Sequence, residues 1–136
     1  MPSDIKPLEY GDLPSEGISL KPGIKLWVSN ESGILGPGVI RLLSFVETFG
    51  SLKHAALEMG LSYSKARKIV ASIEHGLGVD VVSVQQGGKH GGNTTLTAVG
   101  KDLIDRYEAF MSECAGLVQT SFDKHFGEFL RNASQI

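Results

Sequence analysis

The pattern between residues 51 and 100 constrains the fold of this chain most strongly, because it predicts two helices joined by a tight glycine turn. Ser51 and Ser62 are suited to cap the two helices, since a serine hydroxyl accepts a hydrogen bond from the free N–H groups of a first helical turn. Gly60 supplies the turn between them. The second helix is predicted from Ser62 to about Leu77, and the pair has the layout of a helix-turn-helix.

The elements on either side of this pair follow the order of a winged helix-turn-helix. Upstream, apolar residues recur at helical spacing from Pro37, a residue type favoured at the first helical position, up to Gly50. Downstream, residues 81–85 and 94–97 are short β-prone runs separated by a glycine-rich stretch, which predicts a two-stranded wing with a flexible tip. The fold is therefore expected to be mostly α with a small β wing.

The N-terminal part is predicted to be an extended tail followed by a strand. Residues 1–22 are rich in proline and acidic residues and have no apolar periodicity, which is typical of an extended segment. Residues 23–30 alternate between apolar and polar side chains, with Ile24, Leu26 and Val28 on one side. We expect this strand to pair with the wing.

A long C-terminal helix with an apolar seam is predicted to join two copies of the chain. The seam steps by four and three residues, as in a coiled coil, and consists of Leu103, Tyr107, Phe110, Cys114 and Leu117. Unbroken, the helix would have ~33 residues and a length of about 50 Å, more than a small domain covers. Gly116 and Gly127 cost ~1 kcal/mol each relative to alanine and leave its continuity open.

Length and composition fit one small domain with an N-terminal tail and a C-terminal helix. The 136 residues are 41% hydrophobic and 21% charged, as in ordinary globular chains. We expect an extended tail over residues 1–22, a winged helix-turn-helix domain over 23–97 and a dimerisation helix over 98–136. No apolar run approaches the ~20 residues that cross a bilayer, and the first residues lack the pattern of a signal peptide. The predicted location is cytoplasmic, without a membrane partner.

A helix-turn-helix presents the start of its second helix to the major groove of double-stranded DNA. The outward residues there are basic or carry hydroxyl groups, which contact phosphates or base edges. Although the whole chain has a net charge of −2, residues 50–107 hold seven basic and five acidic residues. At the wing tip, glycines let backbone N–H groups and a cation approach DNA. The expected DNA-binding residues are Ser62, Tyr63, Ser64, Lys65, Arg67, Lys68, Lys89 and His90.

Two of these residues have alternative roles. Ser62 is expected to act mainly as a helix cap, and Tyr63 is equally suited to close the core beneath the wing.

The motifs of enzymes and metal sites are absent from the sequence. Cys114 is the only cysteine, so that an intramolecular disulfide and a cysteine metal cage are excluded. The four histidines show no metal-ligand spacing. Gly88-Lys89 is followed by His90 instead of the serine or threonine of a P-loop. We expect a protein that is not an enzyme and has no cofactor.

With these residues in place, the segment from Gly36 to Tyr107 resembles the N-terminal winged-helix domain of ModE-type molybdate-responsive transcription regulators, relatives of the LysR-type DNA-binding domains. The resemblance is carried by Gly36-Pro37-Gly38, Gly50-Ser51-Leu52, Gly60-Leu61-Ser62-Tyr63, and the wing Gly87-Gly88-Lys89-His90-Gly91-Gly92 followed by Leu96-Thr97 and Gly100. It implies a winged-helix fold and DNA binding.

This chain departs from the family pattern at three positions. Family members often carry a basic residue at the position of Ser64, a tryptophan at that of Arg67 and an arginine at that of Val84. Phosphate contacts and operator sequence are therefore expected to differ. The chain up to Ile136 also has no counterpart of the family's C-terminal molybdate-binding domains, so the resemblance alone implies no molybdate response.

The leading hypothesis is a homodimeric, sequence-specific transcription regulator. Two recognition helices, residues 62–77, would enter successive major grooves ~34 Å apart. Repression is favoured, because a bare DNA-binding dimer acts most simply by occluding polymerase. Two alternatives stay open: a winged-helix module that binds a protein, and a sensor that binds a small oxyanion such as molybdate or tungstate at the glycine-rich loop and dimer cleft. The sequence names no effector, operator or target gene.

Overall fold

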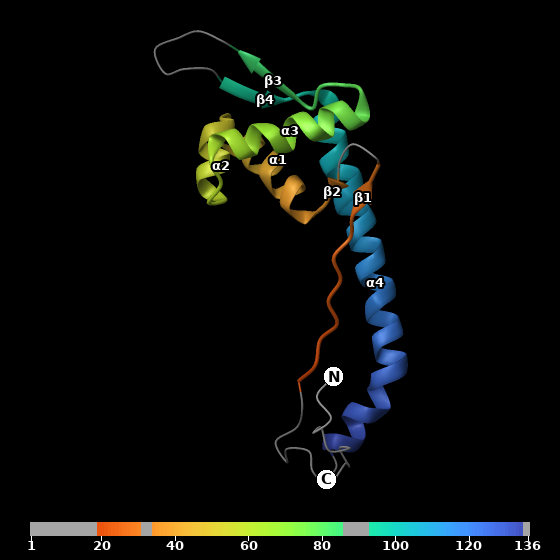
Figure 1. Cartoon of the computed structure of the whole chain (residues 1–136). Coiled ribbons are helices and arrows are strands. Elements are labelled where there is room, and N and C mark those ends of the chain that lie inside the picture. The colour runs from red at the N-terminus through yellow and green to blue at the C-terminus, as the bar shows by residue number, and fades with distance from the viewer. Residues whose placement is uncertain (1–18, 31–33, 86–92, 135–136) are drawn as a thin grey trace, which may run out of the picture. The chain divides into compact units, whose positions relative to one another are not determined.

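The computed structural model describes residues 19–30, 34–85 and 93–134. The described residues divide into two units, one of Lys25–Met111 and the other of residues 19–24 and 112–134. The described part is mostly helical, with small antiparallel sheets and a long C-terminal helix (Figure 1). This confirms the coarse prediction of a mostly α chain. In the described part, no helix is both long enough and apolar enough to cross a membrane.

Three helices form the body of the Lys25–Met111 unit. They are α1 (Pro37–Phe49), α2 (Leu52–Glu58) and α3 (Tyr63–Leu77). Ser51 Oγ accepts a hydrogen bond from the backbone N–H of His54, and Ser62 Oγ accepts one from that of Lys65, each at 3.1 Å. Gly60 turns the chain between α2 and α3 with a φ of 67°, a conformation that glycine adopts without steric cost. Both predicted caps and the predicted glycine turn are confirmed.

An aliphatic core lies between the three helices. Its buried residues are Ile40, Leu42, Leu43 and Val46 from α1, Leu52, Ala55 and Ala56 from α2, and Ala66, Val70 and Ile73 from α3. Each fully buried leucine or valine side chain contributes about 1.5–3 kcal/mol, whereas the alanines let the helices approach closely. Leu77, at the end of α3, does not join this core. Its side chain is 46% exposed, because the last turn of α3 borders an open pocket instead of the core.

A hairpin follows α3 and lies beside it in Figure 1. It consists of two antiparallel strands, β3 (Val82–Gln85) and β4 (Asn93–Leu96). The backbone N–H of Thr94 donates a hydrogen bond of 3.0 Å to the carbonyl of Gly50, which ties β4 to the turn between α1 and α2. Both predicted β-prone runs are confirmed as strands. The tip between them, with Lys89 and His90, lies outside the described residues.

The strand predicted over residues 23–30 is shorter than expected and has a different partner. Only β1 (Val28–Ser29) is a strand there, and it pairs with β2 (Ile34–Leu35) in a separate antiparallel sheet. The expectation that it pairs with the wing was therefore wrong. Local pairing across a short turn closes a much smaller loop than pairing with β3 or β4 would, and its entropic cost is lower. Trp27, beside β1, is 61% exposed.

The C-terminal helix α4 (Ala98–Ser134) starts in close contact with Asp80 and Val81, the residues that lead into β3. Thr97 caps it: its Oγ1 accepts a hydrogen bond from the N–H of Gly100 (3.1 Å) and donates one to the carbonyl of Asp80 (2.8 Å). Gly100 is buried directly against the backbone of Val81, where an added Cβ would overlap the carbonyl oxygen. These contacts give the Leu-Thr-x-x-Gly pattern its physical meaning, because Thr97 starts the helix and Gly100 lets it approach the hairpin.

Helix α4 is continuous at the two glycines that left its course open in the sequence, Gly116 and Gly127. In its first turns, Ile104 and Tyr107 are buried in the core. The Tyr107 hydroxyl donates a hydrogen bond of 2.9 Å to the carbonyl of Leu26, and burial raises the pKa of this hydroxyl. Later in the helix, the rings of Phe122 and Phe126 stack with centroids 5.0 Å apart.

Candidate nucleic-acid interface

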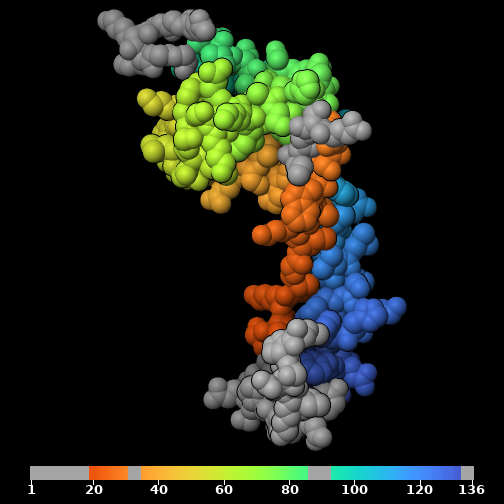
Figure 2. Space-filling view, viewed as in Figure 1, coloured from red at the N-terminus to blue at the C-terminus, as the bar shows by residue number. Residues whose placement is uncertain are grey.

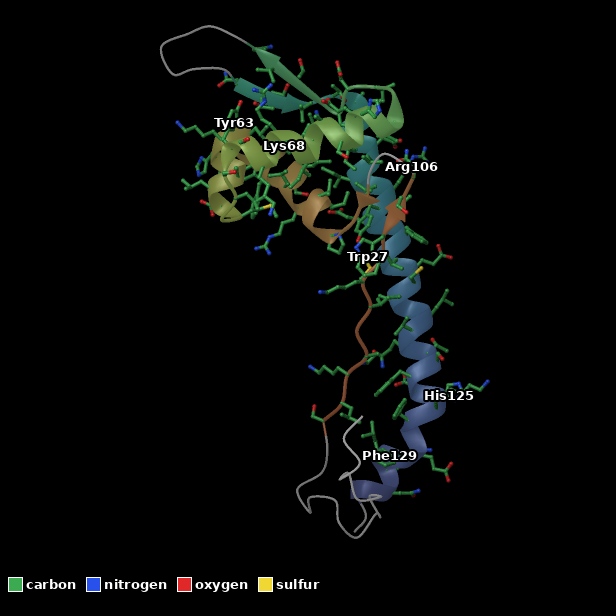
Figure 3. All side chains as sticks on the ribbon, viewed as in Figure 1. Trp27, Tyr63, Lys68, Arg106, His125 and Phe129 are labelled. Carbon is green, nitrogen blue, oxygen red and sulfur yellow. The ribbon has the colours of Figure 1, made fainter. Side chains whose placement is uncertain are left out.

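One exposed face of α3 gathers most of the residues predicted to contact DNA. The side chains of Tyr63, Ser64, Arg67, Lys68 and Ala71 line a shallow depression on this face. Their spacing of three and four residues places them on one side of the helix. Tyr63 and Lys68 are labelled on α3 in Figure 3, and the yellow-green residues of α2 and α3 form a continuous surface in Figure 2. The depression offers cationic, hydroxyl and aromatic groups side by side.

Arg67 is held next to Tyr63 on this face. The guanidinium carbon lies 5.9 Å from the centre of the Tyr63 ring, within the range of a cation–π interaction. Such a contact limits the freedom of the long arginine side chain while leaving its N–H groups available as donors. Tyr63 is 48% exposed, so its ring is not enclosed in the core beneath the hairpin, which was the alternative considered from the sequence.

Two of the predicted residues are placed differently. Lys65 is exposed on another flank of α3, where it lines a second depression with Val39, Ile69 and Lys68. Ser62 is exposed, and its Oγ accepts the capping hydrogen bond from the N–H of Lys65. Lys68 therefore lines both depressions, whereas Lys65 and Arg67 lie in different ones.

A groove runs between α3 and the first strand of the hairpin. Arg67, Tyr63 and Glu74 of α3 line one side, and Val82 and Val84 of β3 line the other. The Glu74 carboxylate accepts hydrogen bonds from backbone N–H groups at the start of β3.

Sequence reasoning missed two residues at this interface, Ala71 and Glu74. Ala71 could have been found from its spacing, since it lies four residues after Arg67 and three after Lys68. For Glu74 the sequence holds no signal, because the role of its carboxylate depends on where the chain returns after α3.

The residues predicted to form a dimer seam on α4 fall into two groups. Leu103 packs against the core of this chain and Tyr107 belongs to it, which differs from the expectation that both face a second copy. These two side chains pack within their own chain because the first turns of α4 cover the three-helix body. Phe110 and Leu117 are 44% and 65% exposed, and Cys114 is half-buried.

Beside this seam, Arg106 is paired with a neighbour on its own helix. Its Nε lies 2.6 Å from a carboxylate oxygen of Asp102, and this hydrogen bond, together with the negative charge, raises the pKa of the Arg106 guanidinium. Both side chains are largely exposed, so the pair contributes little to stability.

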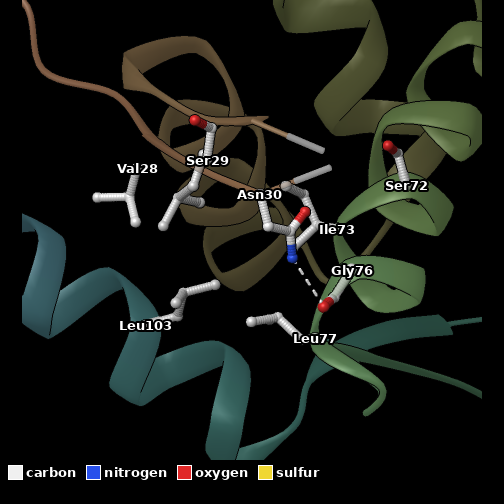
Figure 4. Close-up of a pocket in the computed structure, with 9 residues that line it drawn as sticks. Val28, Ser29, Asn30, Ser72, Ile73, Gly76, Leu77 and Leu103 are labelled. Atoms are coloured by element: carbon white, nitrogen blue, oxygen red, sulfur yellow. Dashed lines mark hydrogen bonds between the residues drawn. The ribbon is translucent and has the colours of Figure 1, made fainter. Parts of the chain in front are cut away.

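At the far end of α3 lies a small apolar pocket of about 190 Å³ (Figure 4). Val28, Leu35, Ile73, Leu77 and Leu103 supply most of its wall. At its rim, the side-chain amide of Asn30 donates a hydrogen bond of 2.8 Å to the carbonyl of Gly76. The described residues give the pocket a predominantly apolar wall without a cationic side chain, so it does not suit an oxyanion. Among the described residues, no group of three or more His, Cys, Asp or Glu side chains is placed to hold a metal ion.

Comparison with known proteins adds a second line of information. No protein-family model matches the sequence. The chain is 38% identical over 90 residues to the molybdenum-pterin-binding protein MopB of Rhodobacter capsulatus. These 90 residues are 66% of this chain and 33% of MopB. The chain is similar to molybdenum-pterin-binding proteins. MopA of the same organism is 31% identical over 88 residues, or 62% of this chain and 33% of MopA. This chain therefore spans about one third of the length of these relatives.

Proposed function

We propose that this chain is a DNA-binding transcription regulator in which α1, α2, α3 and the β3–β4 hairpin act as a winged helix-turn-helix. The observation that carries the proposal is the exposed face of α3, where Ser64, Arg67 and Lys68 lie side by side, with Arg67 on the flank towards the hairpin. A capped helix with cationic and hydroxyl side chains on its outer face is the element that enters a major groove in proteins of this class. The resemblance to ModE-type regulators supports the same function.

The side chains on this face suit different parts of a DNA duplex. Ser64 and Lys68 lie on the outermost side of α3, where hydroxyl and ammonium groups reach base edges. Ala71 is small and lets the helix approach the groove floor. Arg67 lies on the flank towards the hairpin, where its fork of N–H donors suits a phosphate. Lys89 and His90, at the hairpin tip, are proposed to contact the flanking backbone as a wing.

We also propose that two copies bind DNA together. The support is the exposed apolar surface on α4 at Phe110 and Leu117, which are seven residues apart and hence on one side of the helix. A dimer would place two α3 helices about one helical turn of DNA apart, ~34 Å. Repression by occlusion of a promoter is the simplest action of such a dimer.

A salt titration tests the proposal without knowledge of the operator. Binding of the chain to a fluorescent duplex should weaken as salt rises, with log K falling linearly against log[salt], because each phosphate contact releases counterions. Absence of binding even at low salt would contradict the proposal and favour a protein partner for the same surface.

A second candidate function is recognition of a molybdenum-containing ligand. The names of MopB and MopA, both molybdenum-pterin-binding proteins, favour it. The apolar pocket beside α3 does not suit molybdate, so that a site at the glycine-rich tip, outside the described residues, or between two copies would be needed. A rise in Tm with molybdate or tungstate, with no change on adding DNA, would favour this candidate over the regulator.

A further inference from the structure

Glu74 is placed unusually for a residue on the proposed DNA-binding helix, because its side chain is tied to the hairpin. One carboxylate oxygen, Oε2, accepts hydrogen bonds from the backbone N–H groups of Val81 at 2.8 Å and Val82 at 3.3 Å. The backbone carbonyl of Glu74 also accepts a hydrogen bond of 2.8 Å from the N–H of Gly78, where α3 ends. Glu74 therefore holds the chain twice as it leaves α3 and enters β3.

The first of these bonds satisfies a buried group. Val81 is fully buried, and a buried backbone N–H without an acceptor costs free energy comparable to a lost hydrogen bond. Glu74 is half-buried and its bond to Val81 is partly buried, so this bond is shielded from competing water better than a bond on the open surface. The start of β3 is fixed to α3 at this point.

A carboxylate is an unexpected choice for a groove that is proposed to meet DNA. Glu74 lines the same groove as Arg67, and a negative charge there is repelled by phosphates. The negative charge of Glu74 therefore lowers the affinity for DNA unless Glu74 also favours binding in another way. The two hydrogen bonds to β3 supply that contribution, since they set where the hairpin stands relative to α3.

The other strand of the hairpin is held by a different contact. The N–H of Thr94 in β4 donates to the carbonyl of Gly50 at 3.0 Å. The hairpin is thus attached through β4 to the turn between α1 and α2, and through β3 to α3. Asp80 and Val81, which lead into β3, are also held by Thr97, through its Oγ1 and its backbone N–H. Loss of the Glu74 contact would therefore remove the link between β3 and the flank of α3, while the hairpin stays attached at Gly50 and Thr97.

We propose that Glu74 is a positioning residue that fixes the hairpin against α3, so that both elements contact one DNA duplex together. The inference rests on the proposed DNA-binding function. It assigns no direct DNA contact to Glu74, and it predicts that an uncharged acceptor of the same shape can replace the carboxylate.

The test compares Glu74→Gln with Glu74→Ala. Glutamine keeps an acceptor oxygen for Val81 and removes the charge, whereas alanine removes both. In Glu74→Ala, DNA affinity should fall about tenfold, and chemical footprinting should lose the protection flanking the site while retaining that of the major groove. Glu74→Gln should bind at least as tightly as the unchanged chain and keep the flanking protection. Glu58→Ala, on α2, removes the same charge away from the hairpin and serves as the control.

Hydrogen exchange provides a readout that does not need DNA. The amides of Val81 and Val82 should exchange faster in Glu74→Ala and at the original rate in Glu74→Gln, while the amides of α1 stay protected in both, which excludes global unfolding. Equal flanking footprints for the alanine and glutamine variants, or equally slow exchange at Val81, would overturn the inference. If the unchanged chain binds no DNA, the proposed function fails, and exchange at Val81 still decides whether Glu74 holds the hairpin.

Discussion

At the residue scale, Gly100 shows how one atom decides whether two elements can meet. A Cβ at this position would overlap the carbonyl oxygen of Val81, which is backbone and cannot swing away. The substitution Gly100→Ala should therefore lower the free energy of unfolding by about 1–3 kcal/mol, because α4 must shift away from the hairpin. Urea denaturation measures the effect.

Gly116, on the same helix, is the matched control for this prediction. An added Cβ there has open space, so Gly116→Ala should raise the free energy of unfolding by up to ~1 kcal/mol through helix propensity. If both alanine variants changed stability in the same direction, the close packing of Gly100 against Val81 would be refuted.

Arg67 and Lys68 belong to the residue scale as well, because each is proposed to make its own DNA contact. Arg67→Ala and Lys68→Ala should each weaken binding by ~1–3 kcal/mol if the side chain reads a base, and less if it meets only a phosphate. Lys53→Ala, on the exposed side of α2, controls for the loss of one positive charge. Affinity is measured at one fixed salt concentration. An equal loss for all three variants would show a nonspecific charge effect and contradict the assignment of this face.

At the scale of elements, the helices were largely predictable, whereas the contacts between them were not. Serine caps and glycine turns act locally, so that Ser51, Gly60 and Ser62 fixed the ends of α2 and α3 from sequence alone. The pairing of β1 with β2 depends on which partner costs less entropy to reach, and the role of Glu74 depends on the path of the chain after α3. Neither is encoded in a local pattern.

Tyr107 was predicted correctly as part of a helix, but its predicted contact was with a second copy of the chain. Its ring is buried in the core of its own chain, and its hydroxyl bonds to the carbonyl of Leu26. Tyr107→Phe should lower the free energy of unfolding near neutral pH by about 0.5–1.5 kcal/mol, because the Leu26 carbonyl loses its donor. Tyr63→Phe, at an exposed ring, should change it little.

The same substitution predicts a change at alkaline pH. Burial raises the folded-state pKa of Tyr107 above its ordinary value of 10.0, so folding favours the neutral hydroxyl. The resulting stability is fully present below pH 10 and is lost as the pH rises through the folded-state pKa. Denaturation of Tyr107→Phe across this range should show a smaller alkaline loss than the unchanged chain. An identical alkaline loss would mean that Tyr107 ionises without hindrance.

At the scale of the whole molecule, the proposed regulator consists of two copies of the chain. Leu117 is 65% exposed on α4, and a charged residue there should prevent dimerisation because it would bury an unpaired charge. Leu117→Glu is therefore expected to sediment as a monomer. Ala115→Glu introduces the same charge on a different face of the helix and should stay dimeric. A dimeric Leu117→Glu variant would place the interface elsewhere.

Selection of bound sequences from a random duplex library, at near-physiological salt, tests whether this chain recognises a DNA sequence as a dimer. Two copies that each insert α3 into a major groove should enrich an inverted repeat whose half-sites are centred about one helical turn apart, roughly 10 base pairs. Enrichment of such a repeat would establish sequence-specific recognition by a dimer. A pool that stays random, while the protein is folded and dimeric, would contradict the claim that this chain is a sequence-specific DNA-binding regulator.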